Sequence, residues 1–258
     1  MDFYSYKRSI EEICHALSTY QFRECNLFYN EHINQISSVR HVEILDLESA
    51  DLTGAKLYIF QGLSEINLWD CFGMTDETII DLCRYRTTPF RKIDLNNKEI
   101  TDLSLEAIAR VGCEKLCLTN NNRITDSGIQ GIVNSGICCK LDIKFCRGIT
   151  DAAFVDAKGL RSIDLSNGPQ ITDLSKFREC QKLILSEECD IADADLAELC
   201  HCTYLRLGYH HRVTKEGIVT LLNYGVLRKL SLTVSDDSDD DEEELRKMFP
   251  NVNIHLIP

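Results

Sequence analysis

The chain has 258 residues, a formal net charge of -13 and a hydrophobic content of 44%. This length suits one elongated repeat domain or two ordinary domains, and the apolar content is enough for a sizeable core. The acidic balance argues against nucleic-acid binding, which needs clustered Lys and Arg, and against docking on an anionic membrane. We therefore expect neither nucleic acid nor membrane as a partner.

Residues 1–40 come first and are predicted to form an N-terminal helical cap. Ser9-Ile-Glu-Glu12 has the pattern of a helix capping box, and Ile10, Ile13 and Leu17 would form an apolar stripe. Cys25-Asn-Leu27 is a candidate degenerate first repeat. Because no apolar run is long enough for a signal peptide or a membrane span, we expect a cytoplasmic protein, with the nucleus as the alternative location. Its thirteen cysteines are then expected to be reduced thiols.

Residues 41–233 contain a short segment that recurs, in which two apolar residues flank one variable residue. The second apolar residue stands at positions 47, 68, 95, 118, 143, 165, 185, 207 and 232. The steps between these positions run from 20 to 27 residues, close to the spacing of leucine-rich repeats. Each segment predicts a short strand whose apolar side chains enter a core that neighbouring repeats share.

A second motif follows many of these strands, an apolar residue and then Thr-Asp. It occurs five times, at 74–76, 100–102, 124–126, 149–151 and 171–173. Thr or Asp at a helix start can accept hydrogen bonds from the free N–H groups of the first turn, so each unit reads as strand, turn and helix. The sequence therefore predicts an α/β leucine-rich-repeat solenoid, a horseshoe with a parallel β-sheet on the concave face and helices on the convex face.

The combined pattern resembles the cysteine-containing leucine-rich repeats best known from F-box proteins, roughly L-x-L-x-x-C-x-x-I-T-D. Residues 68–76 and 143–151 fit it, and 118–126 fit it with Asn121 in place of Cys. The resemblance implies an adaptor or regulatory role. An F-box usually opens with a Leu-Pro pair, whereas the first proline here is Pro89 and one convincing helix precedes the repeats. The chain looks more like family members without that box, such as the antagonist-of-mitotic-exit type.

Period-two alternation along the strands predicts which side chains face the concave surface. Trp69, the one tryptophan, stands there beside Phe72, and a second group lies near the far end, made of Tyr204, Arg206, Tyr209, His210 and His211. Trp, Tyr and Arg are enriched among binding hot spots, so both groups are candidate partner-binding anchors. The alternative is that Trp69 packs over a turn and the second group is loop surface. A column of lysines beside a column of aspartates is either a charged groove or a set of cross-strand pairs.

Residues 234–258 are predicted to form an acidic loop and a C-terminal cap. Eight acids lie within 236–244, and such blocks are usually solvated. Ser238 stands among them and is a candidate phosphorylation site. Recruitment of a basic partner is the alternative role for this segment.

Catalytic and metal signatures are weak. Cys200-His-Cys202 with Cys189, His210 and His211 nearby does not have the spaced cysteine pairs usual for zinc, and there is no phosphate-binding loop or nucleophile elbow. We therefore expect no cofactor and no enzyme activity. The predicted function is a monomeric intracellular adaptor or regulator that binds another protein on its concave face. One alternative is a substrate-recognition subunit of a cullin-type ubiquitin ligase, and a second is a hydrolase or metal enzyme on a repeat scaffold.

Overall fold

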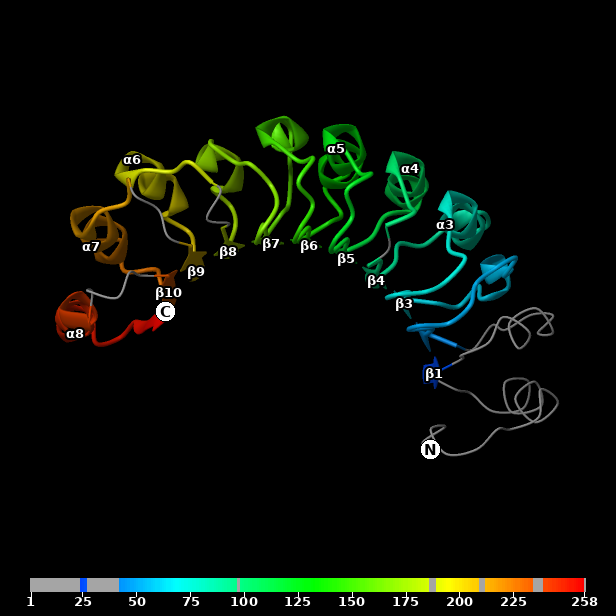
Figure 1. The fold of residues 1–258 in the computed structure, drawn as a ribbon, viewed down its shortest axis with the longest axis horizontal. Coiled ribbons are helices and arrows are strands. Elements are labelled where there is room, and N and C mark those ends of the chain that lie inside the picture. The colour runs from blue at the N-terminus through cyan, green and yellow to red at the C-terminus, as the bar shows by residue number, and fades with distance from the viewer. Residues whose placement is uncertain are drawn as a thin grey trace.

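The computed structural model describes residues 24–26, 42–96, 98–185, 189–208, 212–233 and 239–257. These residues form an arch with one parallel sheet along its concave side and helices along its convex side (Figure 1). The predicted horseshoe is therefore confirmed. The described strands are β1 (Glu24–Asn26), β2 (Ile44–Asp46), β3 (Glu65–Asn67), β4 (Lys92–Asp94), β5 (Lys115–Cys117), β6 (Lys140–Asp142), β7 (Ser162–Asp164), β8 (Lys182–Ile184), β9 (Tyr204–Leu207), β10 (Lys229–Thr233) and β11 (Asn253–Ile257).

The order of the strands in the sheet is their order in the chain, and each strand pairs in parallel with the next. Equivalent apolar residues stand opposite one another, so that Leu45 pairs with Ile66 and Leu116 with Leu141. Pairing also extends beyond residues 41–233: Cys25 of β1 stands opposite Leu45, and Ile254 of β11 opposite Leu230.

The convex side carries α-helices in some repeats and 3₁₀ segments in others. In the described chain these are η2 (Leu57–Ile59), α3 (Asp76–Cys83), α4 (Asp102–Val111), α5 (Asp126–Asn134), η3 (Asp151–Phe154), η4 (Leu174–Phe177), α6 (Asp193–Leu196), η5 (Ala197–Leu199), α7 (Lys215–Asn223) and α8 (Asp239–Met248). None of them is long and apolar enough to cross a membrane.

Repeat length decides which element forms, and this corrects the expectation of a helix in every unit. Repeats with steps of 23 to 27 residues hold α3, α4, α5 and α7, whereas steps of 20 to 22 residues hold η2, η3, η4 and the short α6–η5 pair. A 3₁₀ segment rises about 2.0 Å per residue against about 1.5 Å for an α-helix. A shorter repeat can therefore span the same distance on the convex side with a 3₁₀ segment.

Phenylalanine side chains fill the interior behind the 3₁₀ segments. Phe60, Phe154 and Phe177 stand at or next to the ends of η2, η3 and η4 and are at most 1% exposed. The rings of Phe154 and Phe177 meet edge to face with centroids 5.0 Å apart. These rings supply apolar bulk behind segments of only three or four residues.

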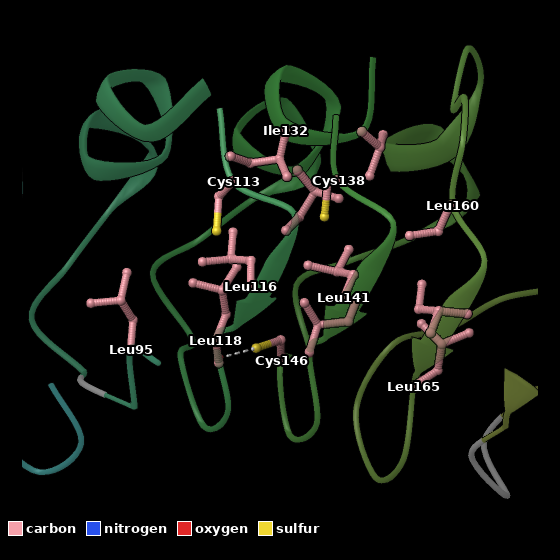
Figure 2. Close-up of a cluster of buried hydrophobic side chains, with 14 of the residues drawn as sticks. Leu95, Cys113, Leu116, Leu118, Ile132, Cys138, Leu141, Cys146, Leu160 and Leu165 are labelled. Atoms are coloured by element: carbon pink, nitrogen blue, oxygen red, sulfur yellow. Dashed lines mark hydrogen bonds between the residues drawn. The ribbon is translucent and has the colours of Figure 1, made fainter. Parts of the chain in front are cut away.

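The core is one continuous stack of leucine and isoleucine side chains between the sheet and the convex elements. Leu95, Leu118 and Leu165 occupy equivalent positions in successive parts of this stack (Figure 2) and are fully buried. Cys113 and Cys138 lie in the same interior, buried among these aliphatic side chains. Each thiol also donates to a backbone carbonyl near the start of the next strand, Cys113 to that of Lys115 at 3.1 Å and Cys138 to that of Lys140 at 3.5 Å.

Cys71 and Cys146 have a more specific structural role at the turn after each strand. The Cys146 thiol donates to the carbonyl oxygen of Leu118 in the preceding repeat at 3.1 Å (Figure 2), and the Cys71 thiol donates to that of Leu47 at 2.9 Å. The thiol at this motif position therefore gives a buried carbonyl of the preceding repeat a hydrogen-bond donor, in addition to the Ala50 N–H that the Leu47 carbonyl also accepts at 2.9 Å.

The Thr-Asp motif joins neighbouring repeats. Four threonines cap their own segments, as expected: Thr101, Thr125, Thr150 and Thr214, of which Thr101 accepts from the Leu103 N–H at 3.3 Å. All but one of the aspartates instead accept from the next repeat, so that Asp102 receives the Thr125 N–H at 2.9 Å and its hydroxyl at 2.6 Å. The same contact recurs in the pairs Asp76–Thr101, Asp126–Thr150, Asp151–Thr172 and Asp193–Thr214.

This series of contacts is interrupted where the motif is weakened. Ala192 stands where the other repeats have threonine, and it offers no hydroxyl to Asp173. Asp173 instead accepts from the Ser175 N–H at 3.0 Å and pairs with Lys176 at 3.3 Å. The hydrogen bond from Ser175, followed by the nearby lysine, lowers the pKa of Asp173.

Candidate protein-binding face

The concave face is formed by side chains at three positions of each strand. The first column precedes the first apolar residue, the second lies between the two apolar residues, and the third follows the second apolar residue. Neighbouring strands in a sheet lie about 4.8 Å apart, so each column is a row of closely spaced side chains on a hydrogen-bonded support. The backbone of this face is therefore preformed by the sheet.

Trp69 stands in the third column after β3 and is 48% exposed. With the Asn96 amide oriented to satisfy its neighbours, the indole N–H donates to the Asn96 amide oxygen at 2.6 Å, and the Asn96 amide nitrogen donates to the Thr119 carbonyl at 2.8 Å. The Trp69 backbone N–H donates to the Asn67 amide oxygen at 3.1 Å. The indole is thus held by Asn96 of the next repeat while much of its surface faces solvent.

Phe72 does not belong to the concave columns. It lies on the turn leading to α3, where its backbone pairs with Ala50 and Leu52 and its side chain is 65% exposed. Trp69 and Phe72 form no ring pair within the described part of the chain, where the recorded ring pairs are Tyr58–Tyr85 and Phe154–Phe177. Phe72 is therefore a separate exposed ring at the rim.

Tyr204 and Arg206 lie on β9, in the first and second columns. The half-buried Tyr204 ring lies between two ammonium groups, with Lys182 at 5.1 Å and Lys229 at 5.2 Å from its centroid. Such contacts attract a cation to the ring face. Arg206 is exposed and forms no ion pair with any described residue. The predicted cluster thus places one restrained aromatic and one available guanidinium side by side.

A shallow hollow of about 310 Å³ occupies the centre of the face, from β4 to β8. First-column lysines surround it, and Asp142, Asp164 and Cys117 lie on its floor. The column of lysines beside a column of aspartates predicts either a charged groove or cross-strand pairs. Among the described residues, Lys92 pairs with Asp94 on its own strand, and the pair across strands comes from the third column, between Lys144 and Asp164.

Lys144 bridges two aspartates of the floor. Its ammonium lies 3.0 Å from Asp142 and 3.2 Å from Asp164. Burial raises the pKa of Asp142, although its bond with Lys144 opposes this shift. Burial alone would lower the pKa of Lys144, but the hydrogen bond that its ammonium donates to Asp142 and the charge of Asp164 outweigh burial and raise that pKa. Lys144 therefore stays protonated as an internal counter-ion.

The cysteine and histidine residues considered for zinc do not converge in the described chain. The Cys202 thiol donates to the Tyr204 carbonyl at 3.1 Å, the Cys189 thiol to that of Pro169 at 3.7 Å, and Cys200 meets His201. No group of three or more potential ligands forms among the described residues. Tyr209, His210, His211 and the candidate phosphosite Ser238 lie outside them.

Buried thiols should be far less reactive than exposed ones in the folded protein. Burial raises the pKa of Cys146 from 9.0 to about 11, which lowers its thiolate fraction about 100-fold. We expect iodoacetamide at pH 8 to label Cys200 before Cys146 and to leave Cys146 unmodified until a denaturant is added, as measured by peptide mass spectrometry. Equal labelling rates for the two residues in the native protein would contradict this assignment.

Comparisons with known proteins agree with this architecture at the level of the fold. No protein-family model and no curated protein matches the chain. Among solved structures, the TLR13–ssRNA13 complex matches with a TM-score of 0.59 and 15% identity over 82% of this chain, which spans 31% of the length of the TLR13 chain. The Rad7–Elc1 complex of yeast gives a TM-score of 0.47 and 14% identity, covering 90% of this chain and 73% of the other. The chain is thus a leucine-rich-repeat solenoid.

Proposed function

We propose that this protein is an adaptor or regulator that binds another protein across its concave face, without catalysis. The observation that carries the proposal is Trp69, a large aromatic side chain that is half exposed and yet held in place by Asn96. An exposed ring on a mobile loop loses conformational freedom on binding. A ring already fixed on a sheet loses less, so more of its contact energy contributes to affinity.

A second anchor, Tyr204 with Arg206, supports the same face. The strands β3 and β9 are six sheet positions apart, which corresponds to roughly 29 Å along the sheet. A partner that reaches both anchors would cover a surface of the width usual for specific protein complexes. Tyr, Trp and Arg are also the residue types that most often dominate the energy of such complexes.

The test is affinity purification from the source cell with wild type and a Trp69→Ala, Tyr204→Ala double variant, followed by mass spectrometry. We expect wild type to retain a specific partner and the variant to lose at least nine-tenths of it, because hot-spot residues cost about 2 kcal/mol or more each.

The matched control is a Tyr85→Ala, Tyr224→Ala double variant, which removes two exposed aromatic side chains, 65% and 46% exposed, next to the convex helices α3 and α7. It should retain the partner. Thermal unfolding of both variants separates a binding defect from loss of the fold. Retention of the same partners by the concave-face variant would overturn the proposal.

The ubiquitin-ligase alternative, a substrate-recognition subunit, rests on the sequence resemblance to F-box proteins. The same purification tests it. Cullin-ligase scaffold subunits that wild type and both double variants capture equally would place this protein in such a complex, with its concave face left for a substrate. Their absence from every sample would leave the adaptor function alone.

A further inference from the structure

We propose that the central hollow of the concave face binds a short, extended, acidic segment of the partner protein. This inference rests on the proposed function, because the hollow lies on the same face as Trp69 and Tyr204 and between them. It adds the chemical class of what is bound.

The charge of the hollow is opposite to that of the molecule. The chain as a whole carries a formal charge of -13. The side chains that line the hollow give a surplus of two positive charges, since the five lysines 92, 115, 140, 144 and 182 outnumber the three aspartates 94, 142 and 164. A local field of reversed sign selects for a ligand of the other charge.

Ion pairs within the hollow concentrate that surplus in the first column. Lys144 bridges Asp142 and Asp164, and Lys92 lies 3.6 Å from Asp94. Lys115, Lys140 and Lys182 form no ion pair with any described residue, and Lys140 and Lys182 are exposed. These three ammonium groups are therefore the ones available to an acidic ligand.

The spacing of the lysines suits an extended peptide that crosses the strands. From Lys92 on β4 to Lys182 on β8 there are four strand-to-strand steps, or roughly 19 Å, which about six extended residues would span. Alternate side chains of such a peptide face one side, so about three acidic side chains would meet Lys115, Lys140 and Lys182. Ser162 fills the gap between Lys140 and Lys182 in the same column and can donate a hydroxyl to a carboxylate.

A protein segment fits this hollow better than a nucleic acid does. A nucleic acid brings a continuous row of phosphates, which would meet the aspartates of the floor and the negative field of the rest of the chain. A short peptide brings only the few charges that the lysines can match, and its uncharged residues can pass over the aspartates.

The probe is a fluorescein-labelled ten-residue peptide of alternating Glu and Ser, with a Gln and Ser peptide of the same length as its reference. Binding to the full chain is followed by fluorescence anisotropy at 50 mM NaCl. We expect the glutamate peptide to bind at least tenfold more tightly than its reference. Because exposed charges are screened by salt, affinity should fall when NaCl is raised to 300 mM.

The decisive variant is Lys140→Gln with Lys182→Gln, and its matched control is Lys98→Gln with Lys158→Gln, which removes the same charge from exposed sites outside the hollow. The first should weaken binding of the glutamate peptide about tenfold, the sum of two modest charge contacts, and the control by less than twofold. An equal effect of both variants, or no preference for the glutamate peptide, overturns the inference.

Two further outcomes would assign the hollow to another occupant. Tighter binding of a ten-nucleotide oligo(U), lost in the same lysine variant, would overturn the peptide assignment in favour of RNA. Self-association in sedimentation that the lysine variant abolishes would assign the hollow to a second copy of this chain. If the partner is captured through Trp69 and Tyr204 but the glutamate peptide does not bind, this inference fails while the proposed function stands.

Discussion

Replacing Phe154 with alanine should lower the free energy of unfolding by about 3–5 kcal/mol, the usual cost of removing a buried aromatic ring. Phe154 is 1% exposed and packs edge to face on Phe177. Its repeat has a 3₁₀ segment of four residues in place of a helix, so few neighbouring side chains can move in to fill the space. Urea denaturation followed by far-ultraviolet circular dichroism measures the effect as a lower midpoint.

Two variants make this prediction specific. Phe154→Leu keeps most of the apolar volume and should cost about 1–2 kcal/mol. Val155→Ala changes the neighbouring residue, which is 57% exposed, and should change stability by less than about 0.5 kcal/mol. A Phe154→Ala protein within 1 kcal/mol of wild type would show that the ring does not support the short repeat.

Replacing Asp76 with alanine should lower the free energy of unfolding by about 2 kcal/mol, because it removes hydrogen bonds between two neighbouring repeats. This value allows for solvent at the half-buried site. The carboxylate accepts the Thr101 N–H at 2.8 Å, the Thr101 hydroxyl at 2.7 Å and the Ser104 hydroxyl at 2.5 Å. Repeat proteins depend on such contacts between neighbours for much of their stability. The same urea titration measures this loss of stability. The matched control is Glu106→Ala, which removes one negative charge from the exposed side of α4.

The pH dependence of the stability difference between wild type and Asp76→Ala is a second measurement on the same contact. Burial raises the pKa of Asp76, but hydrogen bonds from Ser104 and Thr101 outweigh it, so the pKa in the folded protein lies below 3.8. A lowered pKa means that the charged carboxylate stabilises the fold above pH 3.8, and that this stabilisation is lost as the pH falls through the folded pKa. The gap between wild type and Asp76→Ala should therefore narrow from pH 7 to pH 3. A stability difference that stays constant from pH 7 to pH 3 would contradict the role of the charged Asp76 carboxylate as a hydrogen-bond acceptor.

Part of the candidate site could be predicted from the sequence, and part could not. Period-two alternation predicts Trp69, Tyr204 and Arg206 on the concave face, because a strand must alternate its side chains. Tyr204 and Arg206 stand on either side of the buried Leu205 on β9, as this alternation requires. The same reasoning did not identify Asn96 as the support of the indole, since that contact depends on the orientation of two side chains from different repeats. Phe72 was grouped with Trp69 because it is close in sequence, yet it lies on a turn outside the columns.

The sequence by itself determined the architecture of this protein. Apolar residues that recur every 20 to 27 positions cannot be buried within one repeat, so the repeats must stack, and parallel strands in chain order follow. Repeat length also contained a signal for the convex elements, because the shorter steps hold 3₁₀ segments and the longer ones α-helices.

Only the tertiary structure decided which charges are paired. The Thr-Asp motif is compatible with aspartate capping its own helix, and the packing of neighbouring repeats assigns it to the next threonine instead, as Asp102 and Thr125 show. In the same way Lys144 and Lys140 are both concave lysines in the sequence, but Lys144 reaches two aspartates and Lys140 reaches none among the described residues. Side chains from different repeats meet only after the repeats have stacked, because the distances between charges are set by the sheet.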